Sequence, residues 1–282
     1  METPIIQMEG VAVSPMQDPT LTIAEDITWN VAAGDFWVVA GLDGSGKSDF
    51  LMMTGGVVAP AGGCYRLLGE KMPIFEGARL ATRLRLGLVF DGGRLFNHLT
   101  VAENVALPLR YHRNLSALEA WPAVSRLLDR LELTPWAHTT PGAIGRNWQK
   151  RAGLARALTL EPEILLLDNP LAGLDLLHTD WWLGFLDQLS AGDAAAGGRP
   201  VTLVVTAAEV HSWQGHARQF AVLEDRRFTV LGSWAQVAAA DRRLLRHLLR
   251  RETVHSPSPQ STSPGPQSAV HGSRSTSSEE GR

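Results

Sequence analysis

Residues 41–48, GLDGSGKS, decide the fold of this chain, because they match the pattern G-x-x-x-x-G-K-[ST] of a phosphate-binding loop. They follow the apolar run FWVVA at 36–40 and open a helical stretch from Lys47 to about Met53, which is the context that the motif requires. The glycines let backbone N–H groups surround phosphate oxygens, and the N-terminus of the helix adds positive potential. The motif therefore predicts a P-loop NTPase that binds ATP.

Two side chains of this loop carry its chemistry. We expect Lys47 to reach the β- and γ-phosphates, and the Ser48 hydroxyl to ligate Mg²⁺. The alternative is a chance glycine turn, but the sequence has only three lysines, at 47, 71 and 150, so a chance match is a weak explanation. The residues of the loop that we expect to bind the nucleotide are Gly41, Asp43, Gly44, Ser45, Gly46, Lys47 and Ser48.

Composition narrows the class of protein. The chain has 282 residues, 44% of them hydrophobic, with a formal net charge of −3, which excludes a wholly disordered or collagen-like chain and gives no reason to expect nucleic-acid binding. Its single cysteine, Cys64, suits a reducing compartment. No run of about 18 apolar residues and no secretory signal is present, so we expect a cytoplasmic protein whose membrane role depends on partners.

Three further apolar runs predict the architecture. The runs GLVF at 87–90, ILLL at 164–167 and TLVV at 202–205 are separated by helical patterns, as in a parallel sheet that is covered on both faces. Residues 101–160 have helical spacing throughout, and the residues before Phe36 alternate like an antiparallel edge. We therefore predict an α/β fold with a parallel core, an antiparallel β edge and an inserted α-helical subdomain.

The run at 164–167 ends in Asp168, and in P-loop enzymes such a carboxylate holds Mg²⁺, usually through water. The segment EPEILLLDNPLAGLD at 161–175 resembles the Walker B and D-loop segment of ABC transporter ATPases, and RAGLARAL at 151–158 looks like the helix that follows their signature motif. The order and spacing match from about Met8 to Leu249. A narrower resemblance is carried by RLFNHLTVAENVALPL at 94–109, which is similar to the ATPase subunits of MCE-associated phospholipid transporters.

The resemblance implies domains, ligands and partners. Residues 1–251 are expected to form an ABC-type ATP-binding domain, with a RecA-like core at 1–91 and 161–251 and a helical subdomain at about 92–160. Residues 252–282 are rich in Ser and Pro, and we expect them to form a disordered tail. The implied ligands are ATP and Mg²⁺. The implied partners are a transmembrane permease, docked near residues 94–104, and a second ATP-binding subunit. The implied location is the cytoplasmic face of the inner membrane.

Three positions that perform chemistry in the family carry other residues here. Asn169 stands where the family has the Glu that polarises the attacking water, and losing a general base typically costs about 10²–10⁴-fold in rate. Ala207 replaces the His that contacts the γ-phosphate, a loss of one donor that typically costs about 10²–10³-fold. Asp91 replaces a Gln that touches Mg²⁺; a carboxylate is a good Mg²⁺ ligand but repels the phosphate without the metal.

The signature motif and the base-binding loop differ as well. The family's LSGGQ aligns with residues 144–148, IGRNW, in which Arg146 can still supply charge to a phosphate. We interpret Asn147 as the N-cap of a helix over residues 148–160. No aromatic residue lies at 13–16, where a ring that stacks on adenine is expected.

These departures leave three hypotheses. The first is an ATP-binding transporter subunit that hydrolyses slowly or not at all. The second is an active ATPase that uses a substitute base. Glu209 and Asp175 are the candidates, and Glu209 is the better one because Asp175 matches the D-loop of the family. The third is a scaffold that no longer depends on nucleotide. In the family, each nucleotide site of a dimer combines the phosphate loop of one subunit with the signature of the other. This chain carries both the altered base and the altered signature. It is therefore expected to impair both sites of a dimer, whether its partner is an identical chain or an intact subunit.

Overall fold

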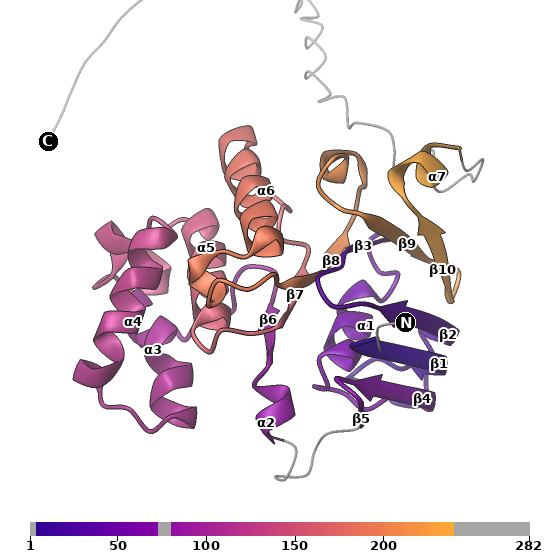
Figure 1. The fold of residues 1–282 in the computed structure, drawn as a ribbon, viewed down its shortest axis with the longest axis horizontal. Helices are drawn as coiled ribbons and strands as arrows, with labels where there is room; N and C mark the ends of the chain where they lie inside the picture. Colours follow the sequence, from indigo (N-terminus) through magenta and orange to yellow (C-terminus); the bar gives the residue numbers. More distant parts are fainter. Residues whose placement is uncertain (1–3, 73–79, 240–282) are drawn as a thin grey trace, which may run out of the picture. The chain divides into compact units, whose positions relative to one another are not determined.

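The computed structural model describes residues 4–72 and 80–239, which form one mixed sheet flanked by helices (Figure 1). The strand order is β5-β4-β1-β2-β10-β9-β3-β8-β7-β6. The strands are β1 Ile6–Val13, β2 Ala24–Val31, β3 Phe36–Ala40, β4 Gly62–Leu67, β5 Glu70–Lys71, β6 Leu86–Val89, β7 Ile164–Asp168, β8 Thr202–Ala207, β9 Gln219–Glu224 and β10 Arg227–Gly232. The helices are α1 Lys47–Thr54, α2 Leu80–Arg83, α3 Val101–His112, α4 Ala117–Arg130, α5 Arg146–Leu158, α6 Leu176–Ala191 and α7 Trp234–Ala239.

The sheet has a parallel part and an antiparallel part. Strands β9, β3, β8, β7 and β6 pair in parallel, whereas β5, β4, β1 and β2 form an antiparallel group. Strand β10 joins the two parts, because it is antiparallel to β9 and parallel to β2. The predicted parallel core with an antiparallel edge is therefore confirmed.

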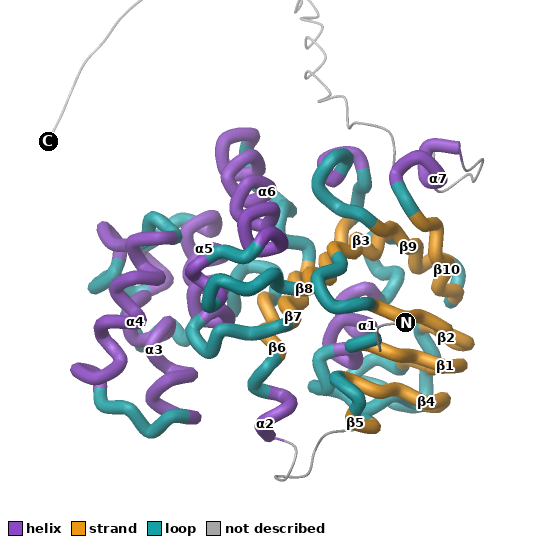
Figure 2. Tube along the Cα trace, in the orientation of Figure 1, coloured by secondary structure: helices purple, strands orange, loops and turns teal. Residues whose placement is uncertain are grey.

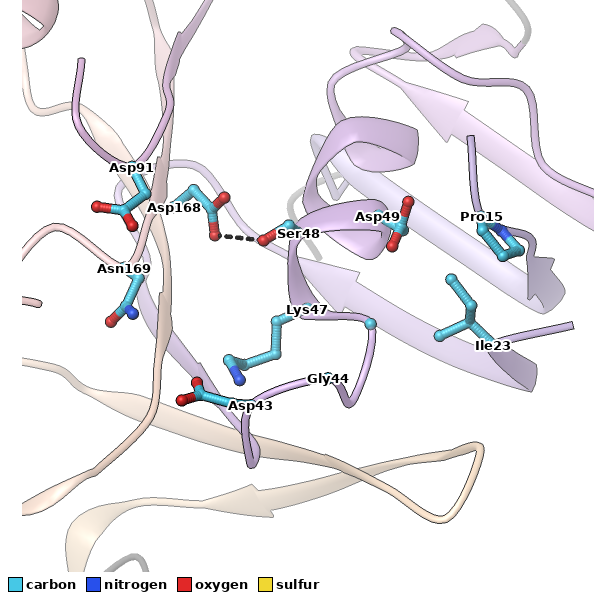
Figure 3. A pocket seen from close by; sticks show the side chains of 11 residues that line it. Pro15, Ile23, Asp43, Gly44, Lys47, Ser48, Asp49, Asp91, Asp168 and Asn169 are labelled. Carbon is cyan, nitrogen blue, oxygen red and sulfur yellow. Dashed lines mark hydrogen bonds between the residues drawn. The ribbon is translucent and has the colours of Figure 1, made fainter. Parts of the chain in front are cut away.

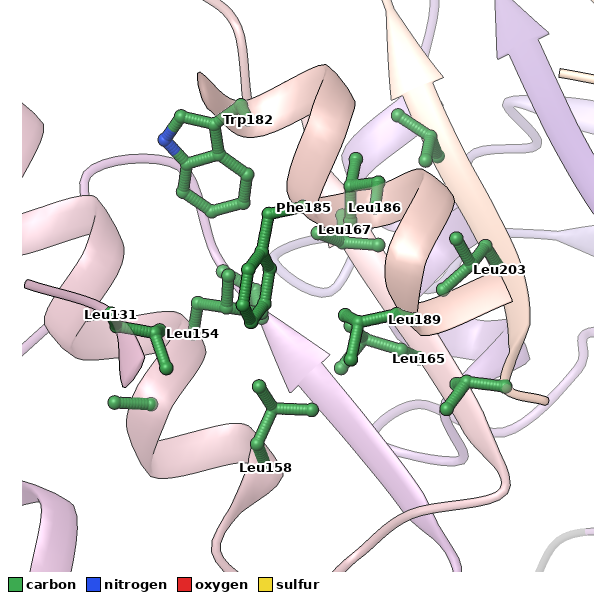
Figure 4. Packing of buried hydrophobic residues seen from close by; sticks show 14 of the residues in the cluster. Leu131, Leu154, Leu158, Leu165, Leu167, Trp182, Phe185, Leu186, Leu189 and Leu203 are labelled. Carbon is green, nitrogen blue, oxygen red and sulfur yellow. The ribbon is translucent and has the colours of Figure 1, made fainter. Parts of the chain in front are cut away.

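The core strands are apolar without interruption because both of their faces are covered. All five residues of β3 are buried, and alternate side chains enter two different clusters. Phe36 and Val38 join the cluster that contains the apolar faces of α5 and α6, whereas Trp37 and Val39 join the one that contains Phe50 of α1. Figure 4 shows the first cluster, where leucines of α5 and α6 meet those of β7 and β8. Because both faces are buried, β3 is apolar throughout and lacks the alternation of apolar and polar residues that is typical of a half-exposed strand.

Helices occupy the chain between β6 and β7, as expected for the inserted subdomain (Figure 2). Helices α3 and α4 each begin with a capping box, in which Thr100 pairs with Glu103 and Ser116 pairs with Glu119. Such boxes satisfy backbone N–H groups that have no partner inside the helix. The boundaries at 91/92, 160/161 and 251/252 stay predictions, and the expected tail, 252–282, lies outside the described residues.

The start of α5 differs from the prediction. The helix begins at Arg146, and Gly145 is its N-cap without any side-chain hydrogen bond, so the prediction of an Asn147 cap and a helix over 148–160 was wrong. Asn147 already lies in the first turn. The Trp148 ring, two residues into the helix, packs against Trp136 and over the Arg151 guanidinium, and these contacts hold the first turn in place. Tertiary packing therefore overrides the capping preference of asparagine.

Two glycines let the backbone of α5 pack directly against the backbone of the loop after β6. A Cβ atom added to Gly153 would lie 2.7 Å from the Cα of Gly93, and one added to Gly93 would collide with the carbonyl of Gln149. Arg156 adds two hydrogen bonds, from Nη2 to the Gly93 carbonyl at 2.8 Å and from Nη1 to the Arg94 carbonyl at 3.0 Å. The loop that carries Asp91 is thus held directly against α5.

This contact predicts opposite effects for two helical glycines. Gly153→Ala should lower the free energy of unfolding by about 1–3 kcal/mol, because the new methyl group meets backbone that cannot move aside cheaply. Gly184→Ala in α6 is the matched control; its Cβ would meet no atom within 4 Å, so it should stabilise by about 0.5–1 kcal/mol. Urea unfolding curves measure both, and equal effects of the two substitutions would contradict the close approach.

Candidate functional site

A cavity of about 480 Å³ opens at the carboxyl ends of the core strands, beside the N-terminus of α1 (Figure 3). Its volume falls in the range of small-molecule sites. The residues that line it are Pro15, Ile23, Asp43, Gly44, Gly46, Lys47, Ser48, Asp49, Asp91, Asp168 and Asn169. The cavity therefore brings together predicted site residues from three segments that lie far apart in the sequence.

The phosphate loop has the backbone that its glycines predict. Gly44 and Gly46 have φ angles of 79° and 88°, in the left-handed region that suits glycine. Gly46 is also the N-cap of α1, and a Cβ atom there would collide with the Ile23 side chain. The first N–H groups of α1 have no acceptor within the helix, so they are donors for an anion at this end.

Lys47 lies folded against its own loop. Its residue is 7% exposed, and Nζ donates hydrogen bonds of 2.7 Å to the carbonyl oxygens of Gly41 and of Leu42. Burial lowers the pKa of the Lys47 ammonium, and the charges of Asp43 and Asp168 offset part of that shift. The structure thus places one ammonium group at the wall of the cavity, as the motif predicts.

The loop also contains polar groups that fit a phosphate. The Ser45 hydroxyl is buried and has no hydrogen-bond partner among the residues described. It lies close to Gly41, since a Cβ atom built on Gly41 would come within 2.6 Å of both the Ser45 Oγ and the Leu223 carbonyl oxygen. An unpaired buried hydroxyl costs about 1–3 kcal/mol, so a ligand oxygen near it would recover stability. The donors of this loop therefore fit a nucleotide phosphate.

Asp168 connects the loop to two strands. Its Oδ1 accepts hydrogen bonds from the hydroxyls of Ser48 at 3.0 Å and Thr206 at 2.8 Å. Thr206 was not predicted from the sequence, although the parallel pairing of β7 and β8 places it directly beside Asp168. Within residues 4–72 and 80–239, no group of three or more His, Cys, Asp or Glu side chains could hold a metal ion. Ser48 and Asp168 instead suit Mg²⁺, which usually binds one or two protein oxygens together with phosphates and water.

Asn169 lines the cavity next to Asp168, in a left-handed backbone conformation with φ 45°. Asparagine adopts this conformation more readily than most residues do. The backbone N–H of Asn169 donates to the Thr206 hydroxyl at 3.1 Å, and its carbonyl accepts from Lys150 Nζ at the same distance. Both contacts are made by the backbone, so they fix the main chain at this position whatever side chain it carries.

Lys150 is a second residue beside the site that was not predicted from the sequence. It is 1% exposed, and besides Asn169 its ammonium donates to the carbonyls of Pro170 at 3.1 Å and Ala172 at 2.8 Å. It also pairs with Asp91 Oδ1 at 3.1 Å. A signal was present, because Lys150 is one of only three lysines in the sequence.

Asp91 is paired twice. Arg146 Nη2 lies 3.1 Å from its Oδ1 and 3.0 Å from its Oδ2, and Lys150 adds the third contact. Burial alone would raise the pKa of Asp91, but the hydrogen bonds and charges of Lys150 and Arg146 outweigh it, so the pKa is lowered and the carboxylate stays ionised. The expected repulsion between this carboxylate and a phosphate is therefore compensated by two cations.

Three other residues singled out from the sequence, Ala207, Glu209 and Asp175, do not line the cavity. Ala207 ends β8 and is 3% exposed; its carbonyl accepts from the N–H of Gly41 at 3.1 Å, but the residue does not line the cavity. The two candidate substitute bases also lie outside the lining. Glu209 accepts from the Ser212 N–H at 3.1 Å, and Asp175 caps α6 by accepting from the His178 N–H at 2.9 Å. None of the residues that line the cavity is aromatic, which agrees with the sequence at 13–16.

Comparison with known proteins identifies the family. The sequence profile of the family described as ABC transporter matches residues 24–172, more than half of the chain. The chain belongs to the ABC transporter ATP-binding family. The predicted family is therefore confirmed.

Curated relatives of this ABC family member include two ATP-binding proteins whose printed names give different transport functions. The intermembrane phospholipid transport system ATP-binding protein MlaF of Escherichia coli K12 is 32% identical over 212 residues, which cover 75% of this chain and 77% of MlaF. The methionine import ATP-binding protein MetN of Lacticaseibacillus paracasei is 30% identical over 213 residues, which cover 75% of this chain and 58% of MetN.

Solved structures agree with the fold of this ABC family member. CbiO1 of Clostridium perfringens, part of the transporter complex CbiONQ, superposes with a TM-score of 0.71 at 20% identity and covers 84% of this chain and 92% of its own. An ATP-binding cassette captured as a dimer after hydrolysis, with ADP and Pi bound, gives a TM-score of 0.69 at 25% identity and covers 79% of this chain and 95% of its own. The predicted fold class is thus confirmed.

The charges of the cavity predict a strong dependence on Mg²⁺. Four carboxylates line it, against the single ammonium of Lys47; Asp91 is paired with Arg146 and Lys150, which leaves the charges of Asp43, Asp49 and Asp168 to act on the phosphates. Chelating Mg²⁺ should weaken ATP binding by at least about tenfold, because each unscreened carboxylate repels the phosphates by about 1 kcal/mol even in water.

Asp43→Asn should recover about fivefold of the metal-free affinity, because it removes one of these charges. Asp129→Asn, on the exposed side of α4, is the control and should change nothing. Calorimetric titration with and without EDTA measures both. Equal affinity in the two buffers would contradict the charge argument.

Proposed function

We propose that this chain is an ATP-binding subunit of an ABC transporter that binds Mg-ATP and hydrolyses it slowly or not at all. The observation that carries the proposal is the position of Asn169. It lines the cavity directly after Asp168, where the family has Glu, while neither Glu209 nor Asp175 lines the cavity. A neutral carboxamide cannot accept a proton from water at pH 7. The residues that bind phosphate are present, but no general base stands at the expected position.

For the nucleotide we propose the loop residues of 41–48 as phosphate ligands, with Lys47 at the β- and γ-phosphates. Ser48 and Asp168 are the proposed Mg²⁺ ligands, because their oxygens already share one hydrogen bond at the wall of the cavity. When bound, the metal would neutralise phosphate charge. Asp91 was also a candidate ligand; since Arg146 and Lys150 engage both of its oxygens, we propose that it anchors these cations instead.

The proposed partners are a transmembrane permease and a second ATP-binding subunit, identical or different. The segment near 94–104 supports the first of them. Asn104 is fully buried and holds this loop through hydrogen bonds with the backbone N–H and carbonyl of Phe96, at 2.8 and 3.0 Å. Phe96 itself is 52% exposed and presents an aromatic ring for docking. No described helix is long and apolar enough to cross a membrane.

We further propose phospholipid cargo and a location at the cytoplasmic face of the inner membrane. The support is the resemblance of residues 94–109 to phospholipid-trafficking ATPases and the 32% identity to MlaF. The two competing hypotheses make different predictions. An active ATPase needs a base that can accept a proton from the attacking water, and a scaffold needs no nucleotide.

Nucleotide titration and phosphate release, measured on the same purified chain, test the proposal. We expect Mg-ATP to bind, and Lys47→Ala to abolish binding, because the substitution removes the ammonium from the loop. Arg126→Ala, exposed on α4, should bind like the unsubstituted chain. Phosphate release should stay far below about 1 s⁻¹, the low end of ordinary enzyme turnover. Turnover at or above that rate would favour the active-ATPase hypothesis, and absence of binding would favour the scaffold.

A matched pair of substitutions isolates the missing base. Asn169→Glu should raise phosphate release relative to Asn169→Gln by up to about 10²–10⁴-fold, because the two side chains share their length and only Glu can accept a proton. Both substitutions place a residue other than Asn at φ 45°, so they should share a similar loss of stability. Equal rates for the pair would mean that another step, such as the altered signature segment, blocks hydrolysis.

A further inference from the structure

Strand β8 contains two buried threonines, one at each end of the strand. Thr202 is 2% exposed, and its hydroxyl accepts a hydrogen bond of 2.9 Å from the N–H of Gly34. Thr206 is 0% exposed and lies beside Asp168 in the parallel register of β7 and β8. A buried hydroxyl is costly unless it is hydrogen-bonded, so the partners of each threonine hold it in place. Of the two, Thr206 is the one whose partners line the nucleotide cavity.

The hydrogen bonds of Thr206 fix the direction of its proton. The hydroxyl accepts from the backbone N–H of Asn169 at 3.1 Å, and that N–H is shared with the Thr206 carbonyl at the same distance. A hydroxyl has a single hydrogen to donate, and here the hydrogen goes to Asp168 Oδ1 at 2.8 Å. Because Thr206 itself does not line the cavity, this donor reaches Asp168 from the core of the sheet.

A second hydroxyl donates to the same oxygen of Asp168, but from the opposite side of the site. It belongs to Ser48, whose Oγ lies 3.0 Å from Oδ1 (Figure 3). Ser48 is exposed and lines the cavity, so its hydroxyl is shared between Asp168 and whatever the cavity binds. Among the described residues, both hydrogen bonds to this carboxylate go to Oδ1 and none goes to Oδ2.

We propose that Thr206 is a positioning residue for the metal site of the nucleotide bound in the loop. Its hydroxyl fixes the rotamer of Asp168 from the core and leaves Oδ2 for Mg²⁺. Residues that orient a metal ligand through a hydrogen bond typically contribute about 10–100-fold to metal affinity without touching the metal. The gain in ATP affinity that Mg²⁺ provides therefore depends on Thr206. This inference rests on the proposed nucleotide site, and it adds the residue that orients the carboxylate of that site.

Calorimetric titration of the full chain with ATP, in Mg²⁺ and in EDTA, tests this role. Thr206→Val keeps the shape of the side chain and removes the hydroxyl, so it should reduce the gain in ATP affinity that Mg²⁺ provides by about tenfold. ATP affinity in EDTA should stay within about twofold, because Thr206 does not line the cavity. Thr206→Ser keeps the donor and should retain the gain within about threefold.

Thr202→Val is the matched control, because it removes the other buried hydroxyl from the same strand. It should leave the gain from Mg²⁺ unchanged, although thermal unfolding should show a loss of stability comparable to that of Thr206→Val. Thr206→Cys takes the place of Thr206→Val if the latter does not fold. Its thiol is a weaker donor than a hydroxyl, so it should also lower the gain.

Three results would overturn the inference in favour of a purely structural hydroxyl. They are an unchanged gain in the variant without the hydroxyl, an equal loss of ATP affinity in Mg²⁺ and in EDTA, and a loss that Thr206→Ser does not recover. If the unsubstituted chain binds no ATP in either buffer, the proposed function fails as well. If it binds ATP more tightly with Mg²⁺ and Thr206→Val keeps that gain, only this inference fails.

Discussion

The parallel pairing of β3, β8 and β7 is the constraint on which the site depends. It places the ends of the three strands side by side, so that Gly41 follows β3, Ala207 ends β8 and Asp168 ends β7. Two hydrogen bonds then connect the ends of these strands to one another. The Gly41 N–H bonds to the Ala207 carbonyl, and the Thr206 hydroxyl bonds to Asp168. Because both faces of these strands are buried, a register shift of one residue would move every side chain into the opposite cluster, where its shape does not fit. The cavity is therefore fixed by the core and not by the loops alone.

Helix α5 connects two of the loops that surround the cavity. Its glycine contact with Gly93 and its cations Arg146 and Lys150 connect the loop after β6 to the turn after β7. The buried ammonium of Lys150 holds three carbonyls of that turn, including the one of Asn169. Altered residues at 91, 146 and 169 are thus neighbours in one network. Their changes are best understood together, since contacting residues in one network are rarely additive.

Some parts of this arrangement could be predicted from the sequence and others could not. The phosphate loop and the apolar strands were predictable because local pattern and tertiary role agree there. The start of α5 was not, because Trp148 packing decides it against a capping preference. Lys150 and Thr206 were also missed, since a buried ammonium and a strand hydroxyl acquire their roles only when distant segments meet. The double pairing of Asp91 depends on residues more than 50 positions away, which no local pattern reveals.

The energetics of the loop bear on the choice between a nucleotide-binding subunit and a scaffold. A buried Ser45 hydroxyl without a partner and an ammonium folded onto two carbonyls are both costly in a protein that binds nothing. Costs of this kind are typical of sites whose ligand offsets them. Asn169, by contrast, has a left-handed backbone conformation that asparagine adopts more readily than most residues do. The unsatisfied or buried polar groups of this site therefore lie in the loop at 41–48, which supports the proposal that the loop binds a nucleotide phosphate over the scaffold hypothesis.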